Sequence, residues 1–101
     1  MKNVLVLFEF PNLTVGQYEK TWDDLRAAGH TAPEGLIHHI GAQSGNGIAV
    51  ADVWESETAF KDFGAVLMPI LKKNGFPDVQ PRILPVAYRF ESKEKHEFAA
   101  P

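Results

Sequence analysis

The stretch "GLIHHIGAQSGNGIAVADVWES", residues 35–56, decides the fold of this chain. It contains two strand-like runs, 35–43 and 47–55, on either side of the turn-forming residues "SGN". Short apolar runs that flank a turn rich in Gly and Asn are typical of a β-hairpin. We therefore expect two antiparallel strands that fold back on each other here.

The length of the turn determines which residues face each other across the hairpin. If residues 45–46 form a two-residue turn, His39 stands opposite Asp52 and Ile37 stands opposite Trp54. A four-residue turn keeps this register, whereas a three- or five-residue turn gives His39 another neighbour. The first arrangement places a His–Asp pair and a tryptophan on one face of the sheet.

The segments outside the hairpin predict two helices and two further strands. Residues 3–10 and 81–91 are typical of strands because they are short and rich in aliphatic and aromatic side chains. Residues 13–29 and 57–75 are typical of helices because their apolar side chains recur every three or four positions. The order βαββαβ is that of the ferredoxin-like α+β fold, a four-stranded antiparallel sheet with two helices on one face. The first and third strands are then central, and the second and fourth lie at the edges.

Capping residues and prolines support these boundaries. Thr14 and Gln17 have the spacing of a capping box, and Gly29 suits the end of the first helix. Pro69 falls inside the second predicted helix and should kink or restart it, because proline cannot donate a backbone hydrogen bond. Pro85 falls inside the last predicted strand and restricts that strand to an edge of the sheet.

Length and composition indicate a small globular protein. The chain of 101 residues suits a single domain, which we expect over residues 1–91, followed by a charged tail over 92–101. The tail is either a frayed terminus or an arm onto a partner. The net charge of −3 gives no electrostatic reason to bind nucleic acid or an anionic membrane. The N-terminal apolar run is short and lacks a cleavage site, so we expect a cytoplasmic protein.

Both central strands carry apolar side chains on both faces. Between Val4 and Phe10 only Glu9 is polar, and apolar residues again occupy both faces of the strand over 47–55. A single layer of helices covers only one face of a sheet. The other face therefore predicts a homodimer in which sheet packs on sheet across a two-fold axis. The alternative is a monomer with some exposed aliphatic side chains.

The two adjacent histidines do not form one site. Side chains alternate along a strand, so His38 and His39 point to opposite faces and cannot bind one metal ion together. We expect no metal site. A carboxylate opposite His39 would fix the imidazole tautomer and raise its basicity, which makes His39 and Asp52 candidate catalytic residues. The alternative is a structural cross-strand pair that satisfies two half-buried polar groups. We expect His38 at the partner subunit or exposed on the edge strand.

Large side chains at helical spacing point into the gap between the helices and the sheet. They are Tyr18, Trp22, Phe63, Leu67 and Met68, and Trp54 from the sheet offers a flat wall for an aromatic substrate. Such a stripe is either core packing or the lining of a pocket, which forms if a kink at Pro69 holds the helices away from the sheet. The candidate ligand-binding residues are Trp54, Trp22, Tyr18, Phe63 and Leu67.

The segment "VADVWES" leading into "ETAFKDF", together with the βαββαβ order, resembles the dimeric α/β-barrel superfamily. Within it, residues 2–90 are similar to small antibiotic-biosynthesis-monooxygenase-like proteins. The resemblance implies a barrel closed across a dimer, with ligands held between each sheet and its own helices. The heme-degrading members use a histidine on the second helix, and residues 57–75 contain none, so we expect no heme and no other cofactor.

These observations lead to one functional hypothesis and one rival. The first is a cofactor-independent, monooxygenase-like enzyme that acts on a small aromatic or polyketide-like compound. His39 would be its acid/base, Asp52 would orient His39, and Trp54 with Trp22 would form the pocket walls. The rival is a non-catalytic dimeric module that binds a small hydrophobic metabolite.

Overall fold

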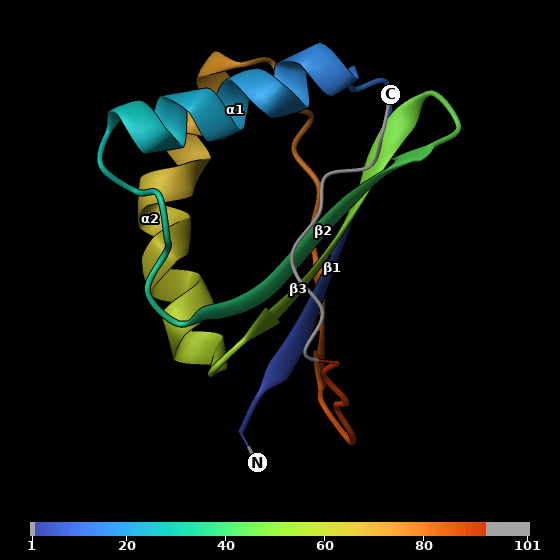
Figure 1. Ribbon diagram of the computed structural model, residues 1–101. Coiled ribbons are helices and arrows are strands. Elements are labelled where there is room, and N and C mark those ends of the chain that lie inside the picture. The colour runs from blue at the N-terminus through green and yellow to red at the C-terminus, as the bar shows by residue number, and fades with distance from the viewer. Residues whose placement is uncertain (1, 93–101) are drawn as a thin grey trace.

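The computed structural model describes residues 2–92 and places two helices on one face of a four-stranded antiparallel sheet (Figure 1). The strand order is β2-β3-β1-β4. The elements are β1 (Val4–Phe10), α1 (Val15–Ala27), β2 (Leu36–Ser44), β3 (Gly47–Trp54), α2 (Glu57–Lys73) and β4 (Arg82–Pro85). This order confirms the ferredoxin-like α+β fold, with the first and third strands at the centre of the sheet.

The first helix begins and ends as its capping residues predict. Thr14 Oγ1 accepts the backbone N–H of Gln17 at 3.1 Å, and Gln17 Oε1 accepts the backbone N–H of Thr14 at 2.9 Å. This reciprocal pair satisfies two of the N–H groups that a helix start leaves without an intrahelical partner. After the cap at Ala28, Gly29 takes a φ of 90°, which suits glycine and turns the chain out of the helix.

The second helix runs through Pro69 without a restart. Ser56 caps its start by accepting the backbone N–H of Ala59 at 3.0 Å, and Asn74 caps its end. Of the two predicted effects of Pro69, a kink or a restart, the restart is therefore wrong. Pro69 is exposed, while Leu71 is buried against the rest of the core, so packing on both sides of the proline holds one continuous helix.

The hairpin register agrees with a two-residue turn over most of its length. Ser44 pairs with Gly47 and His39 pairs with Asp52, as predicted. An irregularity between Leu36 and His38 then shifts the ladder, so Leu36 stands opposite Trp54. The predicted pairing of Ile37 with Trp54 is wrong, because a β-bulge leaves one residue of the bulged strand without a partner.

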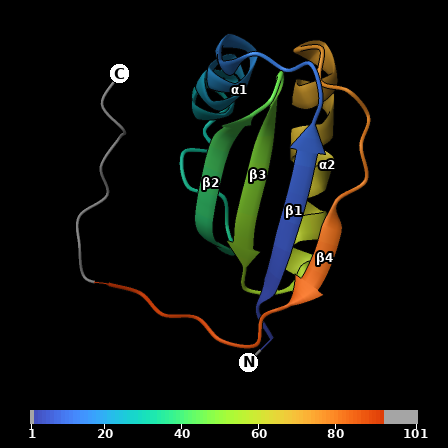
Figure 2. The same ribbon diagram turned by 90° about the vertical axis from the view of Figure 1, so that its right-hand side faces the viewer.

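The last strand is much shorter than the predicted 81–91. It pairs with β1 from Arg82 to Pro85 and lies at the edge of the sheet, as Pro85 requires. Beyond it the chain crosses the end of the sheet, where the Val86 backbone N–H donates to the Asn3 carbonyl at 3.0 Å (Figure 2). The charged tail expected at 92–101 lies, apart from residue 92, outside the described residues.

The two faces of the sheet differ in how they are covered. Both helices lie on the same side, so one face is covered and the other is open (Figure 2). On the covered face Val6 and Trp54 are at most 1% exposed. On the open face Ile40 of the edge strand is 63% exposed, and Ala51 beside it is half-buried. No helix in residues 2–92 is long and apolar enough to cross a membrane.

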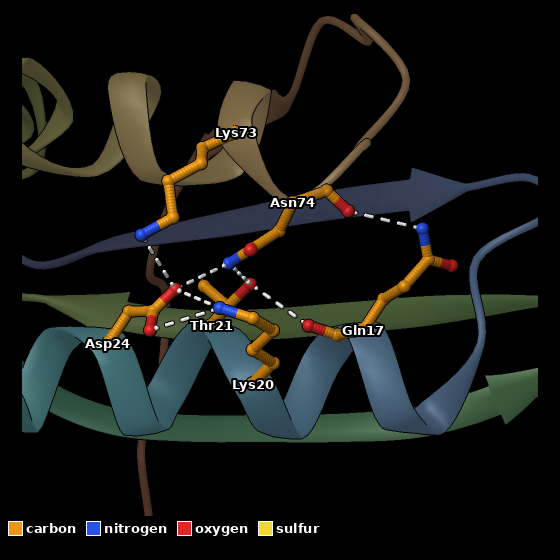
Figure 3. A network of polar contacts seen from close by, with 6 residues as sticks. All are labelled: Gln17, Lys20, Thr21, Asp24, Lys73 and Asn74. Atoms are coloured by element: carbon orange, nitrogen blue, oxygen red, sulfur yellow. Dashed lines mark hydrogen bonds and ion pairs between the residues drawn. The ribbon is translucent and has the colours of Figure 1, made fainter.

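A network of polar contacts ties α1 to the end of α2 (Figure 3); its members are Gln17, Lys20, Thr21, Asp24, Lys73 and Asn74. The Asn74 amide donates to Thr21 Oγ1 at 3.1 Å and to Asp24 Oδ2 at 3.0 Å. The Gln17 amide donates to the Asn74 carbonyl at 3.1 Å. The hydrogen bond from Asn74, with that from Lys20, lowers the pKa of Asp24 below its ordinary value. The network fixes the end of α2 against α1.

Candidate functional site

A cavity of about 60 Å³ lies between the helices and the covered face of the sheet. Its lining includes seven aromatic rings: Phe8, Phe10, Tyr18, Trp22, Trp54, Phe63 and Phe76. The polar side chains in its wall are Thr21, His39 and Asp52. This composition, apolar with a few converging polar groups, is typical of small-molecule sites, while the volume is smaller than theirs.

The predicted lining residues meet at this cavity with one exception. Tyr18 and Trp22 come from α1, Phe63 and Leu67 from α2, and Trp54 from β3. Met68 does not line it and is 56% exposed. The expectation for Met68 is wrong because each step along a helix turns the side chain by about 100°, which carries the residue after Leu67 off the inner face.

The structure joins His39 and Asp52 by a short hydrogen bond. His39 Nδ1 lies 2.5 Å from Asp52 Oδ1, and the two side chains are 20% and 10% exposed. The second carboxylate oxygen of Asp52 accepts the indole N–H of Trp54 at 3.3 Å. Because a carboxylate only accepts hydrogen bonds, Nδ1 is the nitrogen of His39 that carries the proton. The other nitrogen, Nε2, then has a free lone pair on the neutral ring.

Tyr18 occupies that second nitrogen. Its hydroxyl forms a very short hydrogen bond with His39 Nε2, and the two rings are nearly parallel, with centroids 5.8 Å apart. Burial raises the pKa of Tyr18 above its ordinary value. The phenol therefore keeps its proton at neutral pH and donates it to His39. Trp22 packs edge-on against the same imidazole, with centroids 4.7 Å apart.

Gly41 provides the space in which the Tyr18 ring lies. A Cβ at Gly41 would come within 2.2 Å of the Tyr18 hydroxyl oxygen, far inside van der Waals contact. Sequence reasoning missed both this contact and the Tyr18–His39 hydrogen bond. The signal for the first was present, because an isolated glycine within a strand indicates a bulge or the close approach of another group.

His38 lies on the opposite face of β2, as the alternation of side chains predicts. Its Nε2 is 2.5 Å from Glu91 Oε1, and both side chains are more than one-third exposed. Glu91 lies in the segment that follows β4, so the pair joins this segment to β2. Residues 2–92 contain no group of three or more His, Asp or Glu side chains that could hold a metal ion.

No family model and no curated protein matches the sequence, but solved structures share its fold. SnoaB, a cofactor-independent oxygenase from Streptomyces nogalater, superposes with a TM-score of 0.67 at 14% identity, over 91% of this chain and 100% of SnoaB. A "putative Antibiotic biosynthesis monooxygenase" from Chloroflexus aurantiacus J-10-fl gives 0.57 at 15% identity, over 88% and 98%. MupZ from Pseudomonas fluorescens gives 0.60 at 7% identity, over 82% and 71%. At these identities the likeness shows the fold, which is the fold that the sequence resemblance predicts.

Proposed function

We propose that the protein is a cofactor-independent, monooxygenase-like enzyme that acts on a small aromatic or polyketide-like compound. The observation that carries this proposal is the imidazole of His39, which is oriented by Asp52 and lies in the wall of an aromatic cavity. A carboxylate on one imidazole nitrogen is the arrangement that makes the other nitrogen a general base. The solved structures with this fold include a protein described as a cofactor-independent oxygenase.

The chemistry assigned to the site starts with proton abstraction. His39 Nε2 removes a proton from an acidic CH₂ group of the substrate, and Asp52 stabilises the imidazolium that forms. The delocalised substrate anion then supplies the electrons that reduce dioxygen. One oxygen atom stays in the product as a carbonyl and the other leaves as water, so one CH₂ group and one O₂ give one carbonyl and one H₂O. Trp54 and Trp22 would hold the flat substrate.

We also propose that two chains pair through the open faces of their sheets. The strands present an apolar surface there that no segment of the described chain covers, with Ile40, Ala51 and Leu7 at its centre. Light scattering should give twice the mass of the 11.2 kDa chain. Ala51→Glu should give a monomer because it buries a charge at the interface. The matched control, Ala65→Glu on the exposed side of α2, should remain a dimer.

The rival function is a non-catalytic module that binds a small hydrophobic metabolite. One observation favours it: Tyr18 already occupies the free nitrogen of His39, as expected of a structural pair whose hydrogen bonds are complete. The two functions differ in turnover, not in binding. A binding module holds the ligand without consuming dioxygen.

Oxygen uptake with a tricyclic aromatic ketone that carries an acidic CH₂ group separates these functions. If His39 is the base, His39→Gln should lower the rate by about 100-fold or more, the usual contribution of general base catalysis. His38→Gln is the matched control on the other face and should stay within about twofold, because surface pairs of this kind contribute little. Binding of the ketone without any oxygen uptake would favour the binding module. Equal rates for both variants would contradict the role of His39.

A further inference from the structure

We propose that Tyr18 is the gate of the ligand cavity; this inference rests on the proposed function. In the structure its phenol covers Nε2 of His39 in the cavity wall, and it has to swing outward before a ligand reaches this nitrogen. Gly41 has no side chain and so leaves the space that the Tyr18 ring fills in this closed position. The contacts of Tyr18, the size of the cavity and the space at Gly41 each support this role independently.

The contacts of Tyr18 keep the proposed base occupied. His39 Nδ1 is bound to Asp52 and Nε2 to the Tyr18 hydroxyl, so both ring nitrogens have partners within the chain. A lone pair that accepts a hydrogen bond from Tyr18 cannot accept a proton from a substrate at the same time. Access of a substrate to the base therefore requires that the phenol leaves.

The size of the cavity leads to the same requirement. Its volume of about 60 Å³ is enough for a few water molecules. An engineered apolar cavity that binds benzene measures roughly 150 Å³, so an aromatic ligand does not fit beside Tyr18 here. Tyr18 is only half-buried, which leaves its ring a path toward solvent. Outward movement of this ring would give the ligand the space that the phenol now fills.

The space at Gly41 is needed only when Tyr18 is in the closed position. Gly41 lies in β2 without the positive φ that explains the glycines at positions 29, 35, 45 and 75, so its backbone does not demand glycine. The nearest atoms to a Cβ at Gly41 are all in the outer part of the Tyr18 ring. A methyl group at this position would displace the ring while leaving the phenol in the protein. Because the cavity is too small to take the ring, the displaced phenol would move outward.

The test is the binding of 2-naphthol, measured by the quenching of the fluorescence of the two tryptophans and by calorimetry. Gly41→Ala holds the gate open, Tyr18→Ala removes it, and Tyr18→Phe keeps the ring but removes the hydrogen bond to His39. Gly64→Ala is the matched control, because a Cβ there meets open space and Gly64 has no positive φ. Gly41→Ala and Tyr18→Ala should bind about tenfold tighter than the wild type, as expected for a gate closed about nine-tenths of the time. Tyr18→Phe should fall between them and the wild type, and Gly64→Ala should match the wild type.

The outcomes distinguish failure of the proposed gate from failure of the proposed ligand site. Binding of equal strength to the wild type, Gly41→Ala and Tyr18→Ala would overturn the gate and leave the ligand site intact. Weaker binding to both open variants would also overturn it, since Tyr18 would then be a ligand contact. Failure of 2-naphthol to bind any variant would overturn the gate together with the proposed ligand site. If Tyr18→Ala does not fold, Gly41→Ala and Tyr18→Phe alone decide the question.

Discussion

His38 and His39 are neighbours in the sequence and lie in opposite environments. His39 points to the covered face, between Asp52 and Tyr18, where its side chain is 20% exposed. His38 points to the other face, where it is 38% exposed and paired with Glu91. Both have a carboxylate partner at 2.5 Å, so the partner alone does not distinguish them. Within one chain, what differs is the layer of helices, which excludes water from one pair and leaves the other at the surface.

This difference has an energetic consequence. Charges that are taken out of water interact strongly and are costly to leave without a partner, whereas exposed pairs are screened and contribute little. The pair on the covered face is therefore the one that affects both stability and chemistry.

The largest expected effect is on the stability of His39→Ala. Removing this imidazole leaves the carboxylate of Asp52 buried with only the indole N–H of Trp54 as partner. We expect a loss of about 3 kcal/mol in the free energy of unfolding, the size seen when one half of a buried pair is removed. His38→Ala should lose less than about 1 kcal/mol, as for exposed pairs. Urea unfolding measures both, and equal losses would contradict the contrast between the two faces.

A smaller effect should come from removing both members of the buried pair. His39→Leu or Asp52→Leu alone leaves a buried polar partner without its hydrogen bond. The double variant removes both polar groups together, so its loss should be smaller than the sum of the single losses by about 1–3 kcal/mol. The same cycle with His38 and Glu91 serves as the control and should be additive within about 0.5 kcal/mol. Additivity at His39 and Asp52 would show that the pair is not coupled.

Most of this framework could be predicted from the sequence because it depends on local patterns. The capping box at Thr14, the turn after Ser44 and the alternation of side chains in β2 all act over a few residues. The turn places His39 opposite Asp52, and the alternation separates the side chain of His39 from that of His38. The exceptions in the sheet are also local. A bulge after Leu36 shifts the pairing of β2 with β3, and β4 ends early at Pro85; the periodicity of the sequence predicts neither.

The closed state of the site could not be predicted. The hydrogen bond from Tyr18 to His39 joins α1 to β2, and its length depends on how far the helix stands from the sheet. That distance is fixed by the whole core and by the polar network between the two helices (Figure 3). Gly41 was visible as a glycine within a strand, but its neighbour became known only with the packing of α1.

Alkaline pH should reveal the covered environment of Tyr18 through a modest loss of stability. Because burial raises the pKa of Tyr18 in the folded state, the unfolded chain loses this proton first as the pH rises. The contribution is therefore complete below the ordinary tyrosine pKa of about 10 and is lost as the pH rises through the higher folded value. Tyr18→Phe should lack this alkaline loss, whereas Tyr88→Phe, at an exposed position, should retain it. Identical alkaline profiles for the two variants would contradict the burial of Tyr18.

Acidic pH should produce the smallest effect, at the polar network between the helices. The pKa of Asp24 is lowered by the hydrogen bonds from Asn74 and Lys20, so its contribution is present above the unfolded aspartate pKa of about 3.9. The contribution is lost as the pH falls through the lower folded value. Asp24→Asn should flatten this part of the stability profile, while Asp23→Asn on the exposed side of α1 should not. Urea unfolding at several acidic pH values measures the difference.

The central claim is that Asp52 orients His39 so that Nε2 is presented to a ligand cavity. Nitrogen NMR of ¹⁵N-labelled histidine tests it most directly. The account predicts that neutral His39 carries its proton on Nδ1, and that 2-naphthol shifts the Nε2 signal of His39 while the signals of His38 stay unchanged. A proton on Nε2 of His39, or a His39 spectrum that does not respond to saturating 2-naphthol, would contradict it.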